Sequence, residues 1–336
     1  MRFRCLLFFC CLAPAALQAQ LFPQLGGQRA GISALTFLKI EVSPRAAALG
    51  GAGLCLPADA FAPFVNPAAL GRLPAFALGA SHTFWAADVQ YTGLSIAQPT
   101  KAGTFALSLS GLNSGPMPVR TTFQPNGTGE LFYAYYLTAG LSYGKQLTEQ
   151  FSWGATARYV REQLAQFQAN TVVADLAFLY QTDFRGLRFG VMIQNFGPNS
   201  VLRGSVAADT AFNSRPLRLD AYPAPTVFKL ALALTPWESA DGNQSLTAML
   251  QLNHPNDNAE NLLIAAEYQY RELLFLRAGY KFNVKDQPYP TAGLGLRMRM
   301  GRHPLVMDYA FDPLLFLGNV HRVGLSFQLN PVSDSQ

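Results

Sequence analysis

The chain has 336 residues, with 25 Lys and Arg against 20 Asp and Glu; half of its residues are hydrophobic and 13% are charged. This length fits two ordinary globular domains or one large β-barrel. The basic residues are scattered singly rather than gathered into one stripe, which argues against a nucleic-acid-binding protein, so no nucleic-acid partner is expected.

The first 19 residues are typical of a secretory signal peptide. Residues 1–4 are basic, residues 5–17 form an apolar core, and Ala19 is a small residue before an expected cleavage ahead of Gln20. No lipidation box surrounds the cysteines of this segment, and the mature chain would keep only Cys55. This excludes a disulfide framework and a thiolate metal site. We expect an exported protein.

Residues 20–74 are rich in Ala, Gly and Pro and show no sustained alternation. The glycines at 50, 51 and 53 resemble a phosphate-binding loop only weakly, because no Lys-Ser/Thr follows and no strand–helix frame surrounds them. An apolar segment of this length ahead of a barrel would be unfavourable in water. We therefore expect it to pack inside the barrel as a hatch, since larger barrels are often plugged.

From residue 75 to residue 330 the sequence predicts strands. Residues 131–145 show the pattern clearly, with large apolar side chains at every second position and smaller or more polar ones between them. Successive side chains of a strand point to opposite faces, so one face is apolar along its whole length. Similar stretches give about fourteen strands of roughly 9 to 13 residues, the length that a tilted strand needs to cross a bilayer.

These patterns together predict an all-β fold, a transmembrane antiparallel β-barrel of about 14 strands, followed by a periplasmic tail at residues 331–336. After the signal peptide no run of about 18 apolar residues occurs, which argues against transmembrane helices. The expected location is the outer membrane, with lipid around the barrel.

The predicted connections alternate in length, as in outer-membrane barrels, where periplasmic turns are short and external loops longer. With a first strand at 75–85, the external connections include 113–130, 164–170, 197–224, 254–260 and 284–290. The periplasmic ones include 98–101, 145–150, 182–186, 271–273 and 302–303, while 236–243 is somewhat long for that side. The two longest loops, 113–130 and 197–224, both fall outside.

A soluble β-sandwich is the alternative fold, because its strands also alternate. A sandwich usually shows water a face with many charges, whereas the second face here carries Gly, Ala, Ser and Thr with isolated ions. Aromatic residues also gather near strand ends, as in the interfacial girdles of barrels. Both features favour the barrel.

Charges in the middle of strands should face the lumen, because a charge on the lipid face costs about 2–4 kcal/mol at the bilayer midplane. All such residues lie on the polar register of their strands. Hairpin geometry predicts three ion pairs directly across the ladder: Glu267 with Arg277, Asp308 with Arg297, and Asp175 with Arg158.

The remaining luminal cations are Arg188, Lys229, Lys281, Arg299 and Arg322. Two interpretations stay open. The three ion pairs can simply satisfy one another and set the register, or the remaining cations can bind an anionic group or the N-terminal segment.

The sequence offers no catalytic or metal-binding constellation. The four histidines are single and distant from one another, there is no Gly-x-Ser-x-Gly elbow, and Cys55 has no nearby histidine. We expect no enzyme activity, no cofactor and no metal. A barrel enzyme such as a phospholipase would need a Ser/His pair that the sequence does not identify.

Motifs near both ends of the mature chain resemble the PorV/PorQ family, outer-membrane barrels of the type IX secretion system in Bacteroidetes. The N-terminal motifs are Phe37-Leu38-Lys39-Ile40, Arg45 to Ala52 with Gly50 and Gly51, Asp59-Ala60, and Asn66-Pro67-Ala68-Ala69-Leu70. The C-terminal ones are Asp308-Tyr309-Ala310-Phe311, Leu317-Gly318 and residues 321–327; the last strand is also similar to the signal read by the barrel-assembly machinery. Leu56-Pro57-Ala58 departs from the family, which usually has a more acidic stretch there, and Cys55 is unusual.

The resemblance implies a barrel like that of the FadL long-chain fatty-acid transporters, with a luminal hatch that carries Gly50, Gly51, Asp59, Asn66 and Pro67. Such secretion barrels do no chemistry. PorV-type members bind the C-terminal signal domain of secreted cargo and carry it to the attachment complex, and PorQ-type members partner a surface protein. The alternative function is a FadL-like transporter that passes a hydrophobic ligand, such as a long-chain fatty acid, through the lumen with the hatch as a gate.

Overall fold

The computed structural model describes residues 31–204, 219–285 and 287–329. The expected signal peptide (1–19), the first part of the expected hatch (20–30) and the expected tail (331–336) lie outside the described residues. Among the described residues, no helix has the length and apolarity needed to span a membrane.

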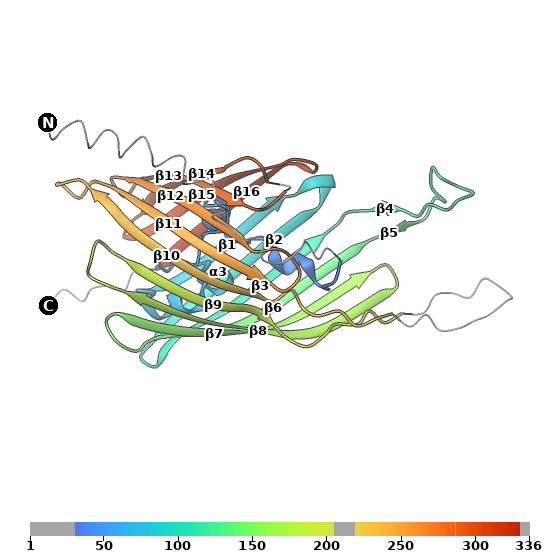
Figure 1. The fold of residues 1–336 in the computed structure, drawn as a ribbon, viewed down its shortest axis with the longest axis horizontal. Helices are drawn as coiled ribbons and strands as arrows, with labels where there is room; N and C mark the ends of the chain where they lie inside the picture. The colour runs from blue at the N-terminus through green and yellow to red at the C-terminus, as the bar shows by residue number, and fades with distance from the viewer. Residues whose placement is uncertain (1–30, 205–218, 286, 330–336) are drawn as a thin grey trace, which may run out of the picture.

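Fourteen antiparallel strands of the described chain close into a barrel (Figure 1). They are β1 (Phe76–Phe84), β2 (Gln90–Thr100), β3 (Gly103–Asn113), β6 (Ala134–Gln146), β7 (Phe151–Leu164), β8 (Phe167–Gln181), β9 (Arg188–Phe196), β10 (Val227–Glu238), β11 (Gln244–Pro255), β12 (Asn261–Tyr270), β13 (Leu274–Phe282), β14 (Thr291–Met300), β15 (His303–Leu314) and β16 (Gly318–Leu329). Each strand pairs with its neighbours, and β1 pairs with β16, from Phe76 opposite Leu329 to Phe84 opposite His321. This closure removes both sheet edges, so the ladder leaves no open row of backbone groups.

The outward face of the barrel is apolar and the inward face is small or polar. On β3, Leu107 is 57% exposed while its neighbour Ser108 is 2% exposed, and on β6 Leu141 is 57% exposed while Ser142 is fully buried. A soluble protein would show the opposite arrangement. The closed barrel and its apolar exterior exclude the β-sandwich and fit a lipid environment.

The barrel has a loop end and a turn end, named here by the length of their connections. The longest connections, from β3 to β6 and from β9 to β10, both lie at the loop end. The first contains a small hairpin of β4 (Met117–Pro118) and β5 (Leu131–Phe132), which projects beyond the barrel (Figure 1). At the turn end the connections are short, such as residues 101–102 between β2 and β3.

Five of the predicted connections are shorter than expected, and two of them show why. The predicted loop 164–170 consists of Ala165 and Gln166 alone, because β7 and β8 continue past the residues where alternation weakens. The predicted connection 236–243 is reduced to residues 239–243, because β10 continues through a bulge between Leu234 and Trp237. A bulge adds a residue to one strand and hides the period of two from the sequence pattern.

Residues 31–74, called the hatch below, lie inside the barrel. They contain η1 (Thr36–Lys39), α2 (Pro44–Ala48), α3 (Ala62–Val65) and η2 (Pro67–Arg72); a further short helix, η3 (Ala86–Asp88), joins β1 to β2. Helix α2 packs on β13 to β16, and η2 packs on β6, β7 and β8 on the other side of the lumen. The hatch therefore bridges opposite walls of the barrel.

Polar side chains cap two of these short helices, α2 and η2. Ser43 accepts a hydrogen bond from the backbone of Ala46 ahead of α2, at 3.3 Å, and Pro44 occupies the first turn. Asn66 does the same for η2: its side chain accepts from the Ala68 amide at 2.9 Å and donates to the Leu54 carbonyl at 2.6 Å. Pro67 follows at the position where a missing amide costs nothing. The Asn66-Pro67 motif is thus a helix cap tied to the preceding loop.

Glycines on the inner wall let the hatch backbone touch the strands. A Cβ at Gly154 of β7 would lie 2.2 Å from the Pro67 carbonyl oxygen, and one at Gly279 of β13 would lie 2.1 Å from the Leu49 carbonyl carbon. On the hatch side, Gly50 and Gly51 follow α2 with φ of 66° and 88°, a conformation that favours glycine. The hatch and the wall are therefore fitted to each other at backbone distance.

Candidate functional site

The hatch separates cavities at the two ends of the lumen. At the turn end lies a cavity of about 820 Å³; toward the loop end lie a smaller one of about 210 Å³ and an open one of about 840 Å³. These are called the turn-end cavity, the cation-lined cavity and the vestibule. The turn-end cavity shares no lining residue with the other two, whereas Ile40 lines both the cation-lined cavity and the vestibule.

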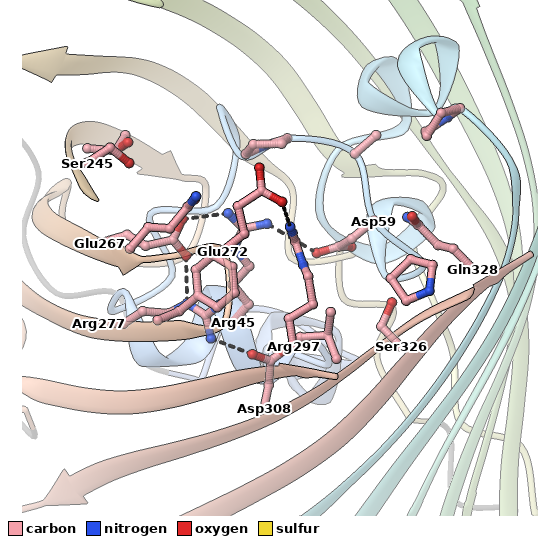
Figure 2. Close-up of a pocket in the computed structure, with 18 of the residues that line it drawn as sticks. Arg45, Asp59, Ser245, Glu267, Glu272, Arg277, Arg297, Asp308, Ser326 and Gln328 are labelled. Carbon is pink, nitrogen blue, oxygen red and sulfur yellow. Dashed lines mark hydrogen bonds and ion pairs between the residues drawn. The ribbon is translucent and has the colours of Figure 1, made fainter. Parts of the chain in front are cut away.

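A network of ion pairs joins the hatch to the barrel wall beside the turn-end cavity (Figure 2). Arg45 of α2 binds Glu267 of β12 through two hydrogen bonds, from Nε at 2.9 Å and from Nη2 at 2.6 Å. The same carboxylate accepts a hydrogen bond from Arg277 of β13 at 2.6 Å, and Arg277 reaches Asp308 of β15 at 2.5 Å. Bidentate, charge-assisted pairs of this kind are among the stronger polar contacts in proteins. The network therefore ties the hatch to Glu267 of β12, and Arg277 links that carboxylate to β13 and β15.

The predicted pair of Asp308 with Arg297 is wrong. Asp308 lies opposite Gly295 instead, because the turn between β14 and β15 is at residues 301–302, one residue earlier than predicted. Gly295 has no side chain, so Arg277 passes over it to Asp308 from the next strand. Arg297 instead pairs with Glu272 at 3.3 Å, near the mouth of the cavity.

The residues of the other two predicted pairs also meet in the lumen. Glu267 lies directly opposite Arg277. Arg158 and Asp175 form a buried ion pair, but the predicted register is wrong, because Asp175 lies opposite Thr156 and Arg158 opposite Val173. The turn here is at 165–166, whereas a direct pair of Asp175 with Arg158 would need it at 166–167.

The N-terminal segment supplies partners for some of the remaining luminal cations. Glu41 of the hatch lies 4.0 Å from Lys229, and both Glu41 and Lys281 border Gly51. Arg322 pairs instead with Asp312 at 3.6 Å. Arg188 and Arg299 line the turn-end cavity. The sequence pattern missed Arg45, Glu41 and Asp312 as partners, because two of them lie in the non-periodic hatch and the third near a strand end.

Burial changes the acidity of two hatch residues. Burial raises the pKa of the Cys55 thiol to about 12, so it stays protonated and donates to the Ala231 carbonyl at 3.4 Å. Burial also raises the pKa of Asp59, although Arg45, with its Nη1 at 3.7 Å from the carboxylate, opposes the shift. Asp59 also accepts a hydrogen bond from the Phe61 amide at 2.8 Å. Both side chains are therefore held by hydrogen bonds inside the lumen.

The vestibule at the loop end is lined largely by aromatic and aliphatic side chains. The ring of Phe37 from η1 packs on Tyr136 of β6, with 4.8 Å between the ring centres, and Ile40, Trp85 and Leu112 lie on the same walls. Glu162 of β7 is the buried acid among them, 8% exposed. This cavity can accommodate a largely apolar group.

The part of the chain that the structure describes contains no group of three or more His, Cys, Asp or Glu side chains placed to hold a metal ion. The turn-end cavity is lined by salt-bridged ions, and on the loop side charged side chains line the cation-lined cavity while aromatic and aliphatic groups predominate in the vestibule.

Comparison with known proteins identifies the fold. No family model matches the chain, and no curated protein matches it. Solved structures do: the toluene transporter TodX of Pseudomonas putida is 14% identical, over 86% of this chain and 98% of that chain, with a TM-score of 0.58. The toluene transporter TbuX of Ralstonia pickettii is 13% identical over 85% and 96%, with a TM-score of 0.56.

A FadL homologue of Pseudomonas aeruginosa is 13% identical over 86% and 98% of the two chains, with a TM-score of 0.50. At these identities the likeness shows the fold alone. The chain is a closed antiparallel barrel of fourteen strands with the architecture of FadL-like barrels.

Proposed function

We propose that the protein is a non-enzymatic barrel of the outer membrane that takes up hydrophobic small molecules through its vestibule. The observation that carries this proposal is the vestibule of about 840 Å³, with Phe37, Trp85 and Tyr136 in its lining, at the mouth of a barrel whose exterior is apolar. TodX and TbuX, which share the fold, are toluene transporters. An apolar molecule entering the vestibule leaves water for a largely apolar wall, which is favourable in proportion to the area buried.

Passage toward the turn end requires the hatch to move. The hatch divides the lumen, and Arg45 holds it to Glu267 on the turn side, while Lys39 holds it to Asp257 at 2.7 Å on the loop side. We expect uptake to require that one of these contacts breaks. Substitutions of Arg45 should raise the leak of hydrophobic molecules through the barrel.

The binding step can be tested on the purified full-length protein with toluene and with oleate as ligands. Trp85→Ala removes an aromatic wall of the vestibule and should weaken binding about tenfold, as measured by calorimetry. Trp237→Ala is the matched control, because Trp237 lies at the turn end and is 46% exposed. Absence of binding, or equal affinity in the Trp85 and Trp237 variants, would contradict this function.

A second function is favoured by the connections at the loop end. The β4–β5 hairpin projects from the barrel (Figure 1), and Phe123 at its tip is 94% exposed. Aromatic residues, Phe among them, are enriched in protein–protein interfaces. Together with the PorV/PorQ-like motifs, this supports a barrel of the type IX secretion system that binds the C-terminal signal domain of secreted cargo or an attachment-complex protein. The other long loop, 197–224, lies partly outside the described residues.

The two functions separate in one experiment. Replacing residues 117–132 with a short Gly-Ser linker should abolish cargo release and partner capture, while calorimetry still shows binding of hydrophobic ligands. Trp85→Ala should do the reverse. Unchanged secretion in the hairpin variant would remove the secretion function. A neighbourhood of attachment-complex genes would favour it, and one of lipid-degradation genes would favour transport.

A further inference from the structure

The cation-lined cavity lies between the hatch and the barrel wall, on the loop side. Its volume is about 210 Å³, several times the volume that one water molecule occupies in the liquid, about 30 Å³. The charged residues that line it are Lys39 and Glu41 of the hatch, Arg158 of β7, Lys229 of β10 and Lys281 of β13. Amide side chains of the same wall, among them Asn253 and Gln194, complete the lining.

The positive charge of this region exceeds the negative charge. Three of its cations have a carboxylate of their own: Arg158 pairs with Asp175, Lys39 with Asp257, and the adjacent Arg322 with Asp312. Lys229 and Lys281 are left with Glu41. Among the described residues, five cations therefore face four carboxylates, and one positive charge stays uncompensated inside the protein.

Hydrogen-bond donors of the same region also lack partners. Lys229 is 9% exposed, and its Nζ is 4.0 Å from Glu41, too far for a hydrogen bond. Lys281 makes no ion pair within 4.0 Å with any described residue. The buried Nε of Arg158 and Nε of Arg322 have no acceptor in the described part of the chain. A buried donor without an acceptor is costly, and a charged one more so.

We propose that the cation-lined cavity binds an oxyanion, a carboxylate or phosphate group, held between Lys229 and Lys281. The anion supplies the missing negative charge and the missing acceptors at the same time. This inference does not depend on the transport function, since it rests on the charges and donors of the cavity alone. The group can be a free anion or the head of an amphiphile, because Ile40 borders both this cavity and the vestibule, where an apolar chain would lie.

The test is calorimetry on the full-length protein in a non-ionic detergent at constant ionic strength, with inorganic phosphate, acetate and octanoate as probes. Lys229→Met should weaken binding of the preferred probe by about tenfold or more, the usual effect of losing one charged hydrogen bond. Glu41→Gln should tighten it, because Glu41 competes with the anion for both lysines. Lys101→Met, in the exposed turn between β2 and β3, is the matched control and should leave it unchanged.

Octanoate binding more tightly than acetate identifies the head of an amphiphile, and phosphate binding more tightly than either carboxylate identifies a free anion; both results support the site. A structural role would make Lys229→Met and Glu41→Gln weaken binding together, whereas an anion site requires opposite effects. If Lys229→Met does not fold, Lys229→Arg should keep the affinity and Lys281→Met should lower it. The proposal is overturned if none of the three anions binds, or if folded Lys229 and Lys281 variants keep the wild-type affinity.

Discussion

Arg45 connects the hatch to the wall through a carboxylate that it shares with Arg277. Glu267 receives both guanidinium groups, and Asp308 receives the second donor group of Arg277. Arg277 therefore pairs with both carboxylates of the wall, and Arg45 adds the contact from the hatch. A substitution of Arg45 leaves the pairs of Arg277 with Glu267 and with Asp308 in place. Its effect on stability therefore measures the contact between the hatch and the wall alone.

We expect Arg45→Met to lower the free energy of unfolding by about 1.5–3 kcal/mol, because two charged hydrogen bonds are lost while Arg277 still compensates Glu267. Denaturant unfolding in lipid vesicles measures this change. Arg297→Met is the control: its pair with Glu272 is half-exposed and should contribute less than about 1 kcal/mol. Equal losses in the two variants would contradict the role of Arg45.

Asp59 gives a pH-dependent prediction. Its pKa in the folded protein is raised above the ordinary value of 3.8, chiefly by burial. A raised carboxyl pKa contributes stability that is fully present below the ordinary pKa and is lost as the pH rises through the folded value. At neutral pH the free energy of unfolding of Asp59→Asn should therefore exceed that of the wild type by the largest amount. This difference should vanish below pH 3.8.

The measurement is the difference in unfolding free energy between wild type and Asp59→Asn as a function of pH. The comparison isolates Asp59, because other titrating groups are common to both proteins. A difference that does not change with pH would show that Asp59 has the same pKa in the folded and unfolded states.

At the scale of elements, the fit between the hatch and the strands depends on glycines in the wall. The η2 helix lies on Gly144 and Gly154, and the end of α2 lies on Gly279. Glycine weakens a strand interior, yet here it lets two backbones touch. These residues hold the hatch at a fixed depth, which keeps Arg45 within reach of Glu267.

Gly154→Ala should destabilise the protein by about 1–3 kcal/mol, because its Cβ would overlap the backbone of Pro67, which cannot rotate away. Gly111→Ala on β3 is the matched control. The nearest atoms to a Cβ there are 3.8 Å away, so its stability should stay within about 0.5 kcal/mol of the wild type. Thermal unfolding of both variants in the same detergent provides the measurement. If Gly154→Ala unfolds at the same temperature as the wild type, the hatch does not pack against β7.

At the scale of the whole molecule, the apolar exterior sets where the barrel can lie. Leu141 is 57% exposed in the middle of β6, and Leu147 is 54% exposed in the turn that follows it. Both would be poor choices for the surface of a soluble protein. In a bilayer the first faces hydrocarbon and the second lies near the headgroups.

We expect Leu141→Arg to cost about 2–4 kcal/mol and Leu147→Arg about 0–1 kcal/mol, because the cost of an outward charge falls with distance from the bilayer midplane. Reversible folding into lipid vesicles, followed by denaturant titration, measures both. A similar cost at the two positions would show that the outward face of β6 does not lie in hydrocarbon.

Local alternation was sufficient to predict much of this molecule from its sequence. Because the side-chain period of a strand is two, Leu107 and Ser108 must lie on opposite faces whatever the rest of the chain does. The same rule predicted that Arg158 and Asp175 would lie inside, and both are buried. The class of fold and the approximate strand count therefore follow from the sequence alone.

One predicted partner failed because a turn was misplaced by one residue, whereas Arg158 and Asp175 still pair diagonally despite the same error. Because the turn lies at 301–302, one residue earlier than predicted, the pairing of β14 with β15 shifts by two residues. Asp308 therefore lies opposite Gly295 and binds Arg277 instead of Arg297. Gly301, with a φ of 66°, contained the signal for the correct turn, since tight hairpins favour glycine at a positive φ. Register depends on turn geometry as well as on the alternating pattern.

The sequence by itself determined which side chains face in and which face out, because that property is local to each strand. The tertiary structure decided the closure of β1 on β16, the place of the hatch and the sharing of Glu267 between Arg45 and Arg277. The pairing of β1 with β16 and the contact of Arg45 with Glu267 each join residues more than 200 positions apart. The hatch also lacks an alternating sequence pattern from which its partners could be predicted. Long-range contacts of this kind arise only when the barrel closes, since closure brings distant strands and the hatch into one lumen.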